Sequence, residues 1–152
     1  MNIHIRLLRM GEDPPMKLLL FADPSVNHVQ EYIQRGQCYV AELEEDIVGV
    51  YVLLPTRPGI AELVNVAVDE DFHGQGIGKQ LVNHAVQSAR SLGFATIEVG
   101  TGSTGIVQLA LYQKCGFRMT SIDRDFFIRH YDEEIHENGM RLYDMVRLSQ
   151  DL

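Results

Sequence analysis

The segment with the clearest capacity for chemistry is a glycine-rich loop that leads into a helix. Gly74, Gly76 and Gly78 alternate after an acidic turn and directly before an amphipathic stretch. A helix N-terminus leaves up to four backbone N–H groups unpaired and carries the positive end of the helix dipole. Because glycine lets a ligand come close to the backbone, this loop predicts an anion site, most naturally for a phosphate or a pyrophosphate.

The spacing of these glycines disfavours the two commonest nucleotide-binding motifs. A P-loop, GxxxxGK[ST], requires glycine where His73 stands and serine or threonine where Gln80 stands. The dinucleotide fingerprint GxGxxG requires a third glycine where Lys79 or Leu81 stands. The alternative is a glycine-rich turn without a ligand, which carries the entropic cost of three glycines without a compensating function.

A second candidate for chemistry is Glu62, on the strand expected over residues 60–68. Simple alternation places Glu62 on one face with the valines at positions 64, 66 and 68, where a carboxylate is unusual. An apolar setting raises the pKa of a carboxyl group, so this side chain could act as a base near neutral pH. The alternative is a strand-end glutamate in solvent or in an ion pair.

Composition and charge limit the partners. The 152 residues carry a formal net charge of -8, with 45% apolar and 22% charged residues, which predicts a single globular domain over residues 1–152. The acidic balance argues against nucleic acid and is compatible with a small cationic substrate. The longest apolar run, Ile47 to Leu54, is strand-sized, and no signal peptide is recognisable, so we expect no membrane association and a cytoplasmic location. The spacing of Cys38 and Cys115 predicts neither a disulfide framework nor a metal site.

The elements that must position these residues follow from apolar periodicity and from glycine and proline punctuation. Helices and strands interleave, whereas the early strands are linked by tight turns at 44–46 and 55–59, which predicts a mixed α/β sheet with helices on its faces. Ser103 or Thr104 is expected to cap the helix before Gly116. We expect strands over 3–8, 37–43, 47–54, 60–68, 95–99 and 141–148, and extended chain over 117–127. Helices are expected over 13–21, 77–93 and 104–116, and a further one begins at Asp23, Pro24 and Ser25, with its cap candidate before the proline, and ends at Gly36.

Two motifs together resemble those of the GNAT acyltransferase superfamily. HGQGIGKQL, from His73, is similar to its pyrophosphate-binding loop, in which arginine or glutamine is followed after two residues by Gly-x-Gly or Gly-x-Ala; here His73 stands at the first position. The preceding VNVAVDEDF resembles the family's fourth strand, and LYQKCGF, from Leu111, resembles its second signature. The resemblance implies a mixed, largely antiparallel sheet of six to seven strands with helices on both faces.

The resemblance also implies acetyl-CoA as the donor substrate, with no metal. Pantetheine would bond to the backbone of Val66, Ala67 and Val68, as an addition to an open strand edge. Lys79 would add positive charge near the phosphates, or would be a solvated surface lysine. The loop residues that would contact the pyrophosphate are His73, Gly74, Gln75, Gly76, Ile77, Gly78 and Lys79.

For catalysis, the resemblance places the hydroxyl of Tyr112 near the thioester sulfur, as an acid for the departing thiolate. The alternative is an aromatic residue beside the core. Glu62 resembles the general base of the histone-type members, although a water chain could serve instead. Many relatives carry asparagine where Gly105 stands here, so one contact to pantetheine is lost or passes to Ser103, Thr104 or water.

In the family, two segments flank the cleft for the acceptor. One runs from residue 23 to 36 and offers Glu31 and Tyr32. The other is acidic and offers Tyr131 and Glu134, and the alternative interpretation of this second segment is a solvated loop. We therefore expect an N-acetyltransferase that acetylates a primary amine of a small molecule, peptide or protein by direct attack. The alternative is a catalytically weak acyl-CoA-binding sensor or regulatory module. Dimers are common in the family, so a homodimer is an alternative to a monomer.

Overall fold

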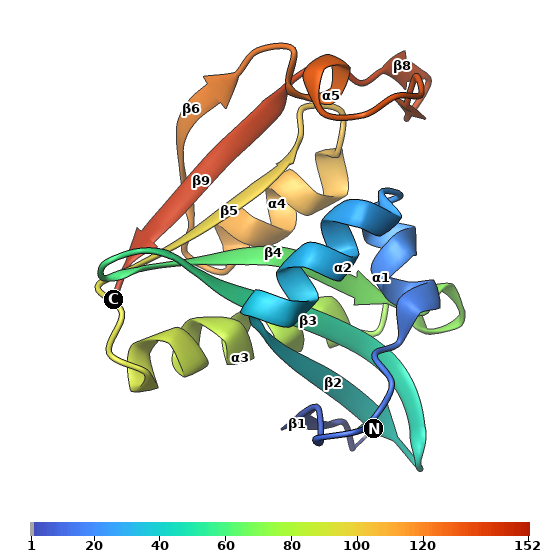
Figure 1. The fold of residues 1–152 in the computed structure, drawn as a ribbon, viewed down its shortest axis with the longest axis vertical. Coiled ribbons are helices and arrows are strands. Elements are labelled where there is room, and N and C mark those ends of the chain that lie inside the picture. The colour runs from blue at the N-terminus through green and yellow to red at the C-terminus, as the bar shows by residue number, and fades with distance from the viewer. Residues whose placement is uncertain (1) are drawn as a thin grey trace.

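The chain folds around one seven-stranded sheet with the strand order β1-β2-β3-β4-β5-β9-β6. The structure, a computed structural model, describes residues 2–152 (Figure 1). The β4–β5 pair is parallel and the other described pairs are antiparallel. The strands are β1 (His4–Leu7), β2 (Gln37–Leu43), β3 (Asp46–Arg57), β4 (Ile60–Val68), β5 (Thr96–Gly102), β6 (Arg118–Asp123) and β9 (Met145–Asp151), with β7 (His136–Glu137) and β8 (Met140–Arg141) in a separate hairpin.

Helices cover both faces of the sheet and create two apolar cores. The helices are α1 (Met16–Ala22), α2 (Val26–Arg35), α3 (Ile77–Ser91), α4 (Ile106–Lys114) and α5 (Phe126–Arg129), with a 3-10 turn at Glu70–Phe72. On one face, α1 and α2 bury Leu19 and Val29 against β2, β3 and β4. On the other face, the apolar side of α3 and Tyr112 of α4 pack on the sheet. The predicted fold is therefore confirmed.

Several local expectations are confirmed and others need correction. α2 starts in the expected segment, but its cap is Ser25 rather than Asp23, because the Ser25 hydroxyl accepts from the His28 N–H at 3.2 Å. Neither Ser103 nor Thr104 caps α4, because Gly105 occupies the cap position and the Thr104 hydroxyl donates to Glu137 instead.

Three element boundaries also differ from the expected ones. β3 continues through Pro55 to Arg57, where a register irregularity accommodates a residue that has no backbone N–H. The stretch expected to be extended over 117–127 ends as a strand at Asp123, and α5 follows. The expected last strand is divided, because β8 ends at Arg141 and β9 begins only at Met145.

A β-bulge in β4 changes which residues share a face. Val52 pairs with Asn65 and Leu53 with Leu63, so Val64 is an extra residue in β4. One extra residue reverses the alternation of side chains beyond it. Glu62, which pairs with Leu54, and Val64 lie on the α1/α2 face, whereas Val66 and Val68 pack toward α3. The prediction that Glu62 shares a face with the valines at 66 and 68 is therefore wrong.

Candidate active site

The bulge marks an opening in the sheet between β4 and β5. These strands pair from Ile60↔Thr96 to Leu63↔Val99 and then diverge (Figure 1). On the other side of β4, toward β3, Asp69 directly after the strand donates its N–H to the carbonyl of Val48 at 2.8 Å. Because alternate residues of an antiparallel pair exchange hydrogen bonds, Ala67 bonds to β3, whereas Val66 and Val68 direct their backbone groups toward the opening. The opening thus exposes a strand edge at Val66 and Val68.

The glycine loop follows β4 and begins α3. Gly74 and Gly76 have φ values of +78° and +81°, which an L side chain rarely adopts, and a Cβ at either position would meet no atom within 4 Å. These two glycines are therefore required by backbone conformation, and the space above them is open. A Cβ at Gly78 would lie 3.6 Å from Leu111 and 3.9 Å from Val68, so the start of α3 packs between α4 and β4.

The polar side chains of the loop have different surroundings. His73 is tied back to the strand, because its Nε2 lies 2.8 Å from the carbonyl oxygen of Val68. This contact fixes the loop against the end of β4 and occupies one carbonyl of the open edge. Gln75 and Lys79 are exposed, whereas the side chain of Ile77 is buried and leaves only its backbone for a ligand. The positive charge of Lys79 is close enough to oppose the rise in the pKa of the Cys115 thiol.

Tyr112 lies in α4 with only 6% of its surface exposed, in edge contact with the ring of Phe117 at 6.0 Å. Burial raises the pKa of its hydroxyl to about 12, since a phenolate would be poorly solvated there. The group is therefore protonated near neutral pH and can act as a proton donor.

Glu62 lies beside another carboxylate at the N-terminal side of the opening. Its register partner on β5 is Glu98, which accepts hydrogen bonds from Arg57 at 3.2 and 3.3 Å. Burial raises the pKa of Glu62, and the like charge of Glu98 raises it further, whereas Arg147 and Arg57 lower it. The net rise makes this carboxyl group a stronger base than an ordinary glutamate.

On the α1/α2 face, a hydrogen-bonded network centred on Asp23 connects segments that are distant in sequence. Tyr32 donates to one carboxylate oxygen of Asp23 at 3.1 Å, and Tyr131 donates to the other at 2.9 Å. The side-chain amide of Asn65, next to the bulge, donates to the Tyr32 hydroxyl at 2.8 Å and to the Leu19 carbonyl at 3.0 Å. Burial, followed by the charge of Asp23, raises the pKa of Tyr131.

The sequence predicted Tyr32 and Tyr131 as neighbours of the acceptor but missed Asp23 and Asn65. Asp23 was interpreted as the start of a helix, and it does accept from the Ser25 N–H at 3.1 Å. No local pattern signals its contact with Tyr131, which is 108 residues away. An asparagine in an otherwise apolar strand is the one signal that could have drawn attention to position 65.

The other two expected acceptor residues lie apart from this network. Glu31 is exposed on α2 and pairs with Arg35 of the same helix at 3.0 Å. Glu134 pairs with His136 at 3.1 Å and with Arg141 at 3.5 Å. It lines a cavity of about 120 Å³ that Tyr131 also borders. The structure therefore brings Tyr32 and Tyr131 together, and it places Glu134 nearby and Glu31 on the outer surface.

Two classes of site have no counterpart among the described residues. Residues 2–152 contain no group of three or more histidine, cysteine, aspartate or glutamate side chains arranged to hold a metal ion. In the same part of the chain, no helix is long and apolar enough to cross a membrane.

Comparison with known proteins identifies the family. Residues 8–117 match the sequence profile of the Acetyltransferase (GNAT) family. The chain belongs to this family. It is 54% identical over 155 residues to the uncharacterized N-acetyltransferase YvbK of Bacillus subtilis (strain 168), with 100% of both chains covered.

Solved structures of this family agree with the fold described here. The IAA acetyltransferase from Bacillus cereus ATCC 14579 is 50% identical, with a TM-score of 0.96 over 99% of this chain and 100% of that chain. A GNAT family acetyltransferase from Elizabethkingia anophelis with acetyl-CoA bound is 40% identical, with a TM-score of 0.97 over 99% of both chains. This GNAT chain is therefore an N-acetyltransferase with acetyl-CoA as its donor, as the motifs predicted.

Proposed function

We propose that this enzyme transfers the acetyl group of acetyl-CoA to a primary amine of a small molecule or peptide by direct attack. The observation that carries the proposal is the bulge at Val64. It opens the sheet between β4 and β5 and turns Glu62 to the α1/α2 face, where Asp23 and the two tyrosines also lie.

The donor would lie along the open edge of β4. Backbone groups of Val66 and Val68 face the opening and can bond to the amides of pantetheine, in the manner of an added strand. The N–H groups from Gly74 to Lys79 at the start of α3 would hold the pyrophosphate. His73 contributes by fixing the loop to Val68 rather than by a free imidazole.

In this proposal, Glu62 is the base and Tyr112 the acid. A lysine-like amine is neutral in only about one molecule in two thousand at pH 7, so a base beside it is useful. The amine nitrogen forms a bond to the thioester carbon, the carbon–sulfur bond breaks, Glu62 takes the amine proton, and Tyr112 gives its proton to the thiolate. The raised pKa of Glu62 suits a base, and the pKa of about 12 keeps the hydroxyl of Tyr112 protonated before the transfer.

The acceptor would enter between the α1–α2 connection and the chain around Tyr131. Asp23, Tyr32 and Tyr131 form one polar wall of this entrance, and Glu62 and Glu98 supply further negative charge on the sheet. Carboxylates and aromatic rings attract an ammonium group before it loses its proton. A cationic amine is therefore the acceptor class that these residues favour.

Thiol release from acetyl-CoA across a panel of amines tests the proposal, and IAA, which the name of the Bacillus cereus relative specifies, is tested beside the panel. Glu62→Gln keeps the shape and removes the base, so turnover at pH 7 should fall about 10²-fold or more and recover partly at high pH. Glu31→Gln, on the exposed surface, is the matched control and should match the parent. Overlapping pH profiles of the parent and Glu62→Gln would remove Glu62 from the mechanism. Acetyl-CoA binding without thiol release for every acceptor would instead support the sensor alternative.

A further inference from the structure

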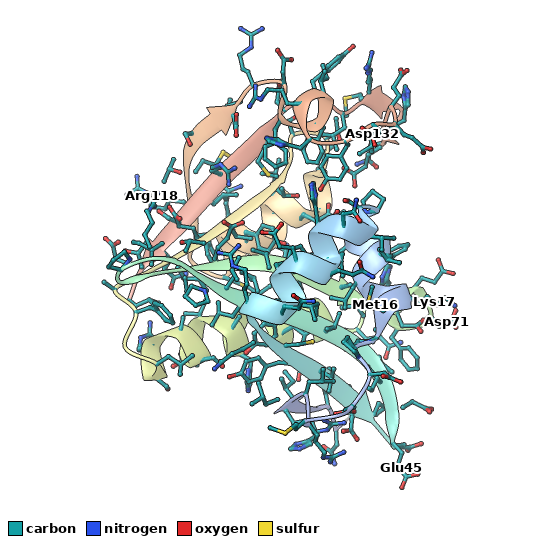
Figure 2. The ribbon with its side chains drawn as sticks, in the orientation of Figure 1. Met16, Lys17, Glu45, Asp71, Arg118 and Asp132 are labelled. Carbon is teal, nitrogen blue, oxygen red and sulfur yellow. The ribbon has the colours of Figure 1, made fainter. Side chains whose placement is uncertain are left out.

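Part of the α1/α2 face of the sheet extends beyond α1 and α2. In Figure 1, α1 and α2 lie over β3 and β4 and leave β9 in view. In Figure 2, Arg118 lies at one end of this part, and Asp132 lies in the loop beyond its other end. Polar side chains occupy it in register, because Glu62 pairs with Glu98 across β4 and β5, and Glu98 pairs with Ser149 across β5 and β9. This surface lies directly beside the proposed base.

Arg147 of β9 lies on this surface, diagonal to Glu98. It pairs with Gly100, two residues beyond Glu98 along β5. Cross-strand partners share a face, and diagonal neighbours in an antiparallel pair are about 7–8 Å apart, within reach of long side chains. The charge of Arg147 lowers the pKa of Glu62, which agrees with this proximity. A guanidinium group therefore lies close to the position at which the acceptor amine would be deprotonated.

The guanidinium of Arg147 is only loosely held by the protein. Its one described hydrogen bond is to Asp123, at a long 3.5 Å, and the other oxygen of that carboxylate is bound by Arg129 at 2.6 Å. The side chain is 37% exposed, and its guanidinium carbon lies 5.6 Å from the centre of the Phe126 ring. A guanidinium has five N–H donors, and among residues 2–152 only one of those of Arg147 has a described protein acceptor.

A structural arginine in the same chain has a different environment. Arg6 is 13% exposed, and its two terminal nitrogens bind the two oxygens of Glu12 at 2.8 Å each, while its Nε binds Glu42. Its donors are thus used in a bidentate pair within the protein. Arg147 has the same fork of donors but only one long hydrogen bond within the protein.

Aromatic and acidic side chains link Arg147 to the acceptor wall. The ring of Phe126, over which Arg147 lies, is 6.4 Å from the ring of Tyr131, and Tyr131 binds Asp23. This face of the sheet therefore carries carboxylates that suit an amine and a guanidinium fork that suits an anion. A carboxylate fits that fork in a planar, bidentate pair.

We propose that Arg147 binds a carboxylate of the acceptor, so that this enzyme favours amines that also carry a carboxylate, such as amino acids or peptides with a nearby acidic group. The inference rests on the proposed function, since it names the acceptor class of the same site. Arg147 is a specificity-determining residue in this arrangement: it orients the acceptor so that its amine faces Glu62.

The test compares amino acids with the corresponding amino acid amides, which lack the carboxylate and are otherwise matched. The quantity measured is the ratio of kcat/KM for the acid to kcat/KM for the amide. The amines of the two acceptors differ in basicity, but this difference cancels when the ratio for a variant is compared with the ratio for the parent. Arg147→Met keeps the stem over Phe126 and removes the charge, and it should lower the ratio at least about tenfold, with the loss in KM for the acid. Arg147→Lys keeps the charge without the fork and should lower it less.

Arg57→Met is the control for simple electrostatics, because Arg57 also lowers the pKa of Glu62 but is bound to Glu98. It should shift the pH profile with both acceptors and leave the ratio unchanged. A ratio that changes less than threefold in Arg147→Met, or equally in Arg57→Met, would overturn the inference. Thiol release with both acceptors would leave the proposed function intact in that case, whereas no release with any amine would refute the proposed function itself.

Discussion

The hydrogen bond between Tyr131 and Asp23 is expected to hold the chain around Tyr131 against the α1–α2 connection. Tyr131→Phe removes this single bond of 2.9 Å and leaves the ring in place. The ring keeps its contacts with Phe127, at 5.3 Å, and with His28, at 5.1 Å. The substitution therefore isolates the contribution of the hydroxyl group.

The magnitude follows from the partners of Asp23. A hydrogen bond to a charged group contributes about 1.5–3 kcal/mol to stability. Asp23 keeps two other donors, the Tyr32 hydroxyl and the Ser25 N–H, and Tyr131 is only half-buried, so the lower end of this range applies. A loss of about 1.5 kcal/mol corresponds to a fall in Tm of about 3–6 °C for a chain of this length.

Thermal unfolding and steady-state kinetics measure the two consequences. We expect the lower Tm together with a rise of at least about threefold in KM for the acceptor, because the loop is no longer fixed, and little change in KM for acetyl-CoA. Because the pKa of Tyr131 is raised, its hydroxyl stays protonated and the difference in Tm should be the same from pH 6 to pH 8. Tyr143→Phe is the control: Tyr143 is 43% exposed and contacts Arg141 through its ring. Equal Tm values for both variants and the parent would refute the stabilising bond, and an unchanged KM for the acceptor would refute its role in the cleft.

Three further predictions concern the glycine loop, the base and the acid. Gly76→Ala forces an alanine into a φ of +81°, which costs about 1–2 kcal/mol, so it should lower both Tm and acetyl-CoA affinity. Gly78→Ala is the control, because its new Cβ would make ordinary contacts at 3.6 Å, and calorimetry should find an unchanged or higher Tm. Folding raises the pKa of Glu62, so the folded protein favours the protonated carboxyl group. The contribution of Glu62 to stability is therefore fully present below the unfolded pKa of this group and is lost as the pH rises through its folded pKa. Glu62→Gln should therefore be more stable than the parent at pH 8 in urea unfolding and should lose that advantage near pH 4, and equal stability at both pH values would contradict the buried charge. Tyr112→Phe should lower turnover by about 10²-fold or more in single-turnover thiol release while acetyl-CoA affinity stays within about twofold, and a smaller effect on turnover would leave Tyr112 a packing residue.

The sequence by itself determined the elements that rest on local rules. The glycine loop could be recognised because positive φ values and a helix start are properties of a few consecutive residues, as Gly74 and Gly76 show. The amphipathic period of α3 and the helix start around residues 23–25 are also local, and both are confirmed. These signals, together with the second motif around Tyr112, were sufficient for the family, the sheet architecture and the donor.

Only the tertiary structure decided which side chains meet around the acceptor. The bulge at Val64 depends on the register with β3, so the sequence of β4 alone predicted unbroken alternation and the wrong face for Val66 and Val68 relative to Glu62. A strand face is defined by pairing with its neighbours, and one inserted residue reverses every side chain beyond it. The contact of Tyr131 with Asp23 and the place of Arg147 beside Glu98 likewise arise from strands and loops that are brought together only by the folded sheet.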